Sequence, residues 1–143
     1  MTTRPTGTLG SSLHWRSRVT ALWSSLPERK RLLIIDDDRR LLTLLQILFE
    51  PDYEIQTAMN GTTALFLVGE FSPDVIILDL EMPDMNGRNV YASLREQGVQ
   101  APVLILSAFG AERATAELGA NAFVNKPFEP TVLLNAVQAL IVN

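Results

Sequence analysis

The chain has 143 residues, of which 47% are apolar and 20% charged, so it is long enough and apolar enough to bury the core of about one domain. No apolar run approaches the roughly 18–20 residues of a membrane-spanning helix, and residues 1–30 lack a secretory apolar stretch, which makes a cytoplasmic protein the default expectation. The absence of cysteine excludes disulfides, thiolate zinc sites and thiol catalysis, and the single histidine, His14, excludes a multi-histidine metal site.

The net charge of −4 combines two parts of opposite sign. Residues 1–31 carry six basic residues and one acid, which gives +5, whereas residues 32–143 carry six basic and fifteen acidic residues, which gives −9. This asymmetry predicts a basic N-terminal extension, residues 1–30, on an acidic domain, residues 31–143. Such an extension could contact nucleic acid, anionic lipid, an acidic partner or its own domain, and the sequence does not choose among these.

The elements are expected in the following order. In the extension, an apolar stripe at helical spacing predicts an amphipathic helix at about residues 12–26, and consists of Trp15, Val19, Leu22, Trp23 and Leu26. Short apolar runs then predict buried strands at 32–35, 53–57, 75–78, 103–106 and 122–124. Helical spacing predicts helices at 39–50, with Asp38 as its cap, and at 61–71, 87–97, 111–118 and from 130 onward. Strict alternation predicts an α/β fold, a parallel sheet with helices on both faces.

Polar residues follow the expected strands at the edge where such sheets place their functional crevice. Asp36 and Asp37 come after the first strand, Asp79 after the third, Ser107 after the fourth and Lys126 after the fifth. Three carboxylates close together are unfavourable unless a cation compensates them. Hard oxygen ligands without His or Cys indicate Mg²⁺. The sequence therefore predicts a magnesium site at the carboxyl edge of the sheet.

A carboxylate, Mg²⁺, a hydroxyl and a lysine together are the parts of a phosphoryl-transfer site. We expect a carboxylate to act as the nucleophile and to form an acyl phosphate. Lys126 would pair with one phosphoryl oxygen, while the Ser107 hydroxyl and nearby backbone N–H groups would bind others.

Four segments in the same order, LLIIDDD, PDVIILDLEMPDMNG, PVLILSA and GANAFVNKPF, resemble the receiver domains of bacterial response regulators. The resemblance covers roughly residues 31–143. It implies a flavodoxin-like, doubly wound sheet of five parallel strands in the order 2-1-3-4-5.

The resemblance also implies roles for the acidic residues. Asp79 would be the phosphoacceptor and a metal ligand. Asp37 would bind Mg²⁺ directly, Asp36 mainly through water, and the backbone carbonyl of Glu81 would be the third protein ligand. The phosphoryl donor would be a histidine kinase or a histidine phosphotransfer protein. The domain would then catalyse only its own phosphoryl transfer and dephosphorylation.

The remaining roles implied by the resemblance concern the response to phosphorylation. Ser107 would be the switch hydroxyl, drawn toward the new phosphoryl group, and Phe123 the aromatic side chain that turns inward behind it. The alternative for Phe123 is plain core packing. Lys126 would be the phosphoryl-binding lysine, followed by a cis peptide bond to Pro127. A repacked surface would then signal to a downstream protein.

Three features depart from the family pattern. Glu81 stands two positions after Asp79, where its side chain either faces the phosphoryl group or points to solvent. Only nineteen positions separate Ser107 from Lys126, which predicts a short or irregular helix at 111–118. No DNA-binding or catalytic output domain is expected after the last helix.

Several alternatives stay open at this point. The extension could dock a partner or form a homodimer, pack on its own domain, or lack order. The domain could be a terminal receiver or a relay intermediate, or a degenerate receiver that acts as a phosphorylation-independent interaction module. An aspartate-nucleophile phosphatase, with Asp36 as nucleophile, is a weaker reading because only Glu129 follows the lysine where paired acids are needed.

Overall fold

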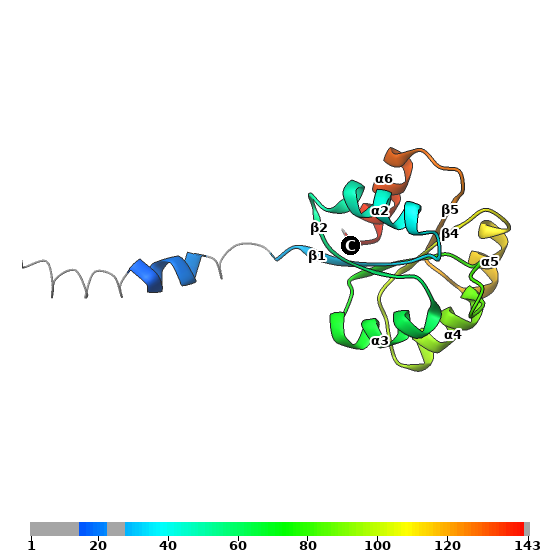
Figure 1. Cartoon of the computed structure of the whole chain (residues 1–143), viewed down its shortest axis with the longest axis horizontal. Helices are drawn as coiled ribbons and strands as arrows, with labels where there is room; N and C mark the ends of the chain where they lie inside the picture. The colour runs from blue at the N-terminus through cyan, green and yellow to red at the C-terminus, as the bar shows by residue number, and fades with distance from the viewer. Residues whose placement is uncertain (1–14, 23–27, 142–143) are drawn as a thin grey trace, which may run out of the picture.

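The computed structural model describes residues 15–22 and 28–141, and contains a parallel sheet flanked by helices (Figure 1). The strand order is β2-β1-β3-β4-β5, which confirms the expected doubly wound topology. The strands are β1 (Lys30–Ile35), β2 (Tyr53–Ala58), β3 (Val75–Leu78), β4 (Val103–Ser107) and β5 (Ala122–Asn125). The helices of the domain are α2 (Arg39–Phe49), α3 (Gly61–Phe71), α4 (Gly87–Glu96), α5 (Ala111–Leu118) and α6 (Pro130–Ile141).

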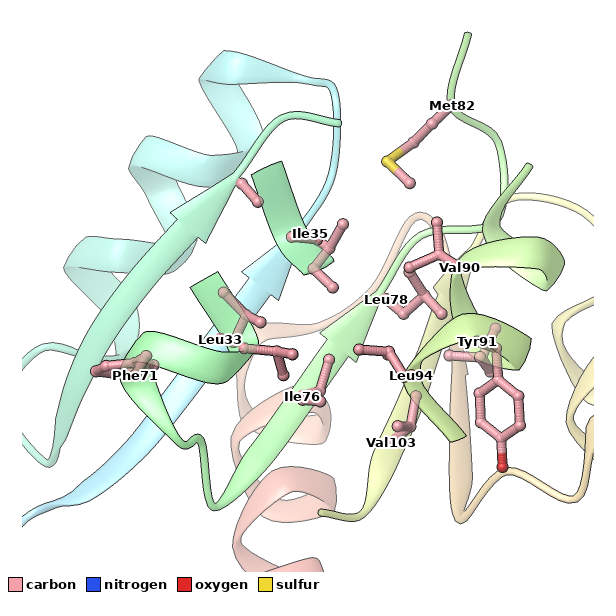
Figure 2. Close-up of a cluster of buried hydrophobic side chains, with 14 of the residues drawn as sticks. Leu33, Ile35, Phe71, Ile76, Leu78, Met82, Val90, Tyr91, Leu94 and Val103 are labelled. Carbon is pink, nitrogen blue, oxygen red and sulfur yellow. The ribbon is translucent and has the colours of Figure 1, made fainter. Parts of the chain in front are cut away.

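Helices cover both faces of the sheet, with α3, α4 and α5 on one face and α2 and α6 on the other (Figure 1). Strands β3 and β4 are buried along their whole length, which explains their unbroken apolar sequences. Alternate side chains enter opposite cores. In β1, Leu33 and Ile35 face α3 and α4 (Figure 2), whereas Leu32 and Ile34 face α2 and α6. The sheet is therefore packed between two apolar layers, one on each face.

Side-chain caps mark the start of α2, α3 and α4. Asp38 caps α2, as expected, because its carboxylate accepts hydrogen bonds from the amides of Arg40 and Leu41. Asn60 and Asn86 cap α3 and α4 in the same way. Helix α5 has only eight residues, which confirms the short helix expected there.

The first strand begins at Lys30, two residues before the expected position. Lys30 and Arg31 are charged and more exposed than the rest of the strand, so apolar periodicity does not detect them, yet they pair in register with the start of β2. The Arg29 guanidinium donates to the carbonyls of Glu50 and Tyr53, and that of Arg31 donates to the carbonyl of Phe71 at 3.0 Å. Arg29 and Arg31, which contribute to the positive charge of residues 1–31, thus contact other parts of the domain.

Glycine is required where α4 starts against the end of β3. A Cβ on Gly87 would lie 2.4 Å from Leu80 Cα and 2.5 Å from the carbonyl oxygen of Asp79. The Gly87 amide donates to the Leu80 carbonyl at 3.0 Å, which holds this close approach. Backbone contacts with Gly87 therefore fix the position of the chain at Asp79 and Leu80. Among the described residues, no helix combines the length and apolarity needed to cross a membrane.

Candidate functional site

The predicted site residues meet at the carboxyl ends of the central strands. Ile35 pairs with Leu78 in the sheet, so Asp36 and Asp79, the next residues, emerge side by side. Ser107 ends β4, and its carbonyl accepts a hydrogen bond from the amide of Lys126 at 3.0 Å. Residues spread over ninety positions of sequence are thus brought to one edge by the parallel register.

The acidic cluster consists of Asp36, Asp37 and Asp79, each of which offers a carboxylate oxygen within 4.8 Å of the others. Asp36 and Asp79 are buried, with 1% and 3% of their surfaces exposed, whereas Asp37 is more exposed. Asp36 also accepts from the Asp38 amide at 2.9 Å, while the Asp37 carboxylate has no protein partner in the described part of the chain. This donor set fits Mg²⁺, a hard cation that binds a few carboxylates and keeps several waters.

Lys126 supplies the positive charge of the cluster. Its ammonium lies 2.8 Å from an Asp36 oxygen and 3.7 Å from an Asp79 oxygen. Burial by itself lowers the pKa of Lys126, but the hydrogen bond and charge of Asp36, with the charge of Asp79, outweigh it, and the net shift is upward. Lys126 is therefore held as an ammonium ion. The Lys126–Pro127 peptide bond is cis, as the family resemblance implied.

The surroundings of Asp79 raise the pKa of its carboxyl group. Burial raises its pKa to about 6, and the neighbouring Asp36 charge acts in the same direction. The Lys126 charge and the hydrogen bond from the Glu81 amide, at 3.3 Å, oppose that rise. Asp79 is thus mostly ionised at neutral pH, in a buried position where its charge is poorly solvated.

Glu81 faces the site, which decides between the two orientations left open by the sequence. The fully buried Ser107 hydroxyl donates a hydrogen bond to one Glu81 carboxylate oxygen. The Ala108 amide donates to the other oxygen at 3.3 Å. Sequence reasoning expected backbone N–H donors near Ser107 but did not identify Ala108, because a backbone amide leaves no signal in residue type.

Phe123 lies on β5 with 37% of its surface exposed, so it is not packed in the core. This position contradicts the plain core-packing alternative. The inward turn of Phe123 on phosphorylation stays a prediction.

The amphipathic helix of the extension is described only at residues 15–22, where the chain is helical. Trp15 and Leu22 are exposed, at 52% and 64%, and Val19 is half-buried. Trp23 and Leu26, the other members of the predicted stripe, lie outside the described residues. The role of the stripe in binding a partner or a second copy stays a prediction.

Comparison with known proteins identifies the family. Residues 32–138 match the model of the response regulator receiver domain. The alkaline phosphatase synthesis transcriptional regulatory protein PhoP of Bacillus subtilis is 35% identical over 78% of this chain and 48% of its own length. The protein-glutamate methylesterase/protein-glutamine glutaminase of Treponema denticola is 41% identical over 68% of this chain and 28% of its own length. The chain spans half or less of the length of these relatives.

Solved structures give the same assignment. A putative response regulator from Chloroflexus aurantiacus superposes with a TM-score of 0.75 and 31% identity, covering 81% of this chain and all of that one. The chemotaxis protein CheY4 of Vibrio cholerae superposes with a TM-score of 0.73 and 28% identity, covering 79% of this chain and 99% of its own. The chain therefore belongs to the response regulator receiver domain family.

Proposed function

We propose that this receiver accepts a phosphoryl group on Asp79 in a Mg²⁺-dependent reaction and signals to a protein partner. The donor would be the phosphohistidine of a histidine kinase or a histidine phosphotransfer protein. One observation carries the proposal. The buried Asp79 carboxylate lies 3.7 Å from the Lys126 ammonium and beside two further carboxylates that could hold a metal ion.

In this reaction, an Asp79 oxygen attacks phosphorus as the P–N bond of the phosphohistidine breaks. The electron pair of that bond stays on the imidazole nitrogen, and the product is an acyl phosphate on Asp79. A pKa of about 6 leaves this nucleophile ionised at neutral pH. The Lys126 ammonium is already charged and lies within reach of Asp79, so it could pair with a phosphoryl oxygen. Attack of water on phosphorus reverses the modification and releases phosphate.

Asp36, Asp37 and Asp79 would hold Mg²⁺, together with the backbone carbonyl of Glu81 implied by the family resemblance. When bound, the ion neutralises negative charge on the phosphoryl group and the carboxylates as the new bond forms. The carboxylate of Asp37, which has no protein partner among the described residues, is the most available ligand, since one Asp36 oxygen is engaged by Lys126.

The signal would pass from the phosphoryl group through Ser107 to Phe123. Movement of the Ser107 hydroxyl toward the phosphoryl group would let Phe123, now partly exposed on β5, turn toward the vacated space. The surface formed by α5, β5 and α6 would then change its shape, a local charge event that biases a two-state element. We expect the apolar stripe predicted for the extension, of which the described Trp15 and Leu22 are exposed, to contribute to partner contact or self-association.

Intact mass spectrometry after incubation with Mg²⁺ and a small acyl-phosphate donor tests the proposal. We expect a single phosphoryl addition to the wild type and none to Asp79→Asn. The Asp37→Asn variant should bind Mg²⁺ much more weakly while keeping the fold. Wild-type-like modification of both variants would refute the site assignment. Lack of any addition to wild-type protein, with Mg²⁺ and with a histidine kinase present, would favour a phosphorylation-independent interaction module.

A further inference from the structure

We propose that the Glu81 carboxylate, in the unphosphorylated protein, occupies the hydrogen-bond donors that a phosphoryl group on Asp79 requires. Glu81 must release these donors before the phosphorylated state is complete. The inference rests on the proposed function of Asp79. It assigns to the side chain of Glu81 a positioning role in that reaction, separate from the carbonyl group that the same residue offers to a metal ion.

The two carboxylate oxygens of Glu81 accept hydrogen bonds from two neighbouring residues of the β4–α5 loop region. One carboxylate oxygen accepts from the Ser107 hydroxyl and the other accepts from the Ala108 amide at 3.3 Å. The Ser107 oxygen also accepts from the Phe109 amide at 3.3 Å, which orients the hydroxyl. Its proton has a second acceptor within reach, the Phe109 carbonyl at 3.2 Å, but a carboxylate is the stronger acceptor. The β4–α5 loop is therefore bound to an anion from its own chain.

A phosphoryl group and a carboxylate compete for these donors. Ser107 has one hydroxyl proton and Ala108 one amide proton, and an ionised carboxylate and a phosphoryl oxygen both act only as acceptors. Neither donor serves both anions at full strength. Two negative groups bound at neighbouring points of one crevice also repel each other. Phosphorylation of Asp79 should therefore expel the Glu81 side chain from Ser107 and Ala108.

The release of Ser107 and Ala108 by Glu81 requires only a side-chain rotation. The side chain of Glu81 is exposed, whereas Ser107 is fully buried, so rotation of the Glu81 side chain alone reaches solvent. Its backbone amide donates to the Asp79 carboxylate at 3.3 Å, so the backbone is held while the side chain leaves. In the unphosphorylated protein, the carboxylate of Glu81 would thus hold the loop much as a bound phosphoryl group would.

Three variants separate this role from a general effect of charge. Glu81→Ala removes both the charge and the acceptor, and Glu81→Gln removes the charge but keeps one acceptor oxygen. Glu112→Gln, in the first turn of α5, removes one acidic charge without any contact to Ser107. The probe is beryllofluoride with Mg²⁺, a phosphoryl mimic that binds an ionised aspartate without a chemical step. Because a hydrogen bond to a charged group changes an equilibrium by about tenfold or more, Glu81→Ala should bind the mimic about tenfold more tightly.

We expect Glu81→Gln to fall between Glu81→Ala and the wild type, and Glu112→Gln to match the wild type. NMR of the protein without the mimic supplies an independent readout. The Ala108 amide resonance should move in Glu81→Ala and stay in place in Glu112→Gln, because only the first variant removes its acceptor.

An unchanged Ala108 resonance in Glu81→Ala would refute the proposal. So would a moved resonance accompanied by affinity for the mimic equal to or weaker than that of the wild type. Failure of the wild type and all variants to bind the mimic would instead refute the proposed function of Asp79. In that case the Ala108 resonance, which needs no mimic, would still decide whether Glu81 holds the β4–α5 loop.

Discussion

Replacing Asp79 by asparagine should stabilise the metal-free protein, and more so at higher pH. The folded state raises the pKa of Asp79 from 3.8 to about 6, because the carboxylate is buried and lies beside Asp36. A carboxyl group with a raised folded pKa binds protons more tightly in the folded state, so the stability of the wild type falls as pH rises between these two values. Asparagine has nearly the same shape and no charge to bury.

The size of the effect follows from the two pKa values. A difference of about two pKa units corresponds to about 3 kcal/mol of unfolding free energy at pH 7.5, where the group is ionised in both states. At pH 5 the folded carboxyl group is mostly protonated, and the same linkage predicts about 1.5 kcal/mol. We therefore expect the gap between the variant and the wild type to shrink by about half on acidification.

Urea unfolding followed by circular dichroism, in the presence of EDTA, measures both gaps. Glu112→Gln, which removes an acidic charge in the first turn of α5, is the control and should show no comparable gain. Adding Mg²⁺ should stabilise the wild type more than Asp79→Asn, because an ion bound to the folded state shifts the equilibrium toward it. An equal gap at pH 5 and pH 7.5, or a less stable variant at pH 7.5, would refute the reasoning.

Four further substitutions test the scaffold and the charge balance. Gly87→Ala should lose about 2 kcal/mol or more of unfolding free energy in urea titrations, because its Cβ would meet backbone atoms at 2.4 and 2.5 Å. Gly69→Ala is the control and should gain up to about 1 kcal/mol, because Gly69 lies in a helix and its added Cβ would have nothing within 4 Å. Phe49→Ala, at a fully buried position, should lose about 3–5 kcal/mol, and a loss below 1 kcal/mol would contradict its place in the core. Lys126→Gln should raise the pKa of Asp79 further, which NMR titration can follow, because that lysine lowers it in the wild type.

Local sequence was sufficient to predict the buried core of the sheet. The runs at Val75–Leu78 and Val103–Ser107 are apolar along nearly their whole length, which is the pattern of strands covered on both faces. Their alternation with helical runs leaves few arrangements, and the structure confirms the parallel topology. The charged start of β1 was not predicted, because Lys30 and Arg31 enter the sheet through backbone pairing and not through burial of apolar side chains.

The meeting of Asp36, Asp79, Ser107 and Lys126 also followed from sequence, since each comes directly after or at the end of a strand and parallel strands end at one edge. Residue type and order therefore determined which groups share the crevice. The distances among them did not follow, and neither did the pairing of Lys126 with Asp36 in preference to Asp79. These depend on side-chain packing within the crevice.

The clearest division between sequence and tertiary structure concerns Glu81. Its position two residues after Asp79 showed only that the carboxylate could point into the crevice or away from it. Tertiary structure decided the matter, because the end of β4 places the Ser107 hydroxyl and the Ala108 amide where a carboxylate from the β3–α4 loop can accept from both. Sequence determines which donors and acceptors the chain carries and to which edge the strands bring them, whereas their pairing depends on three-dimensional positions that no local pattern encodes.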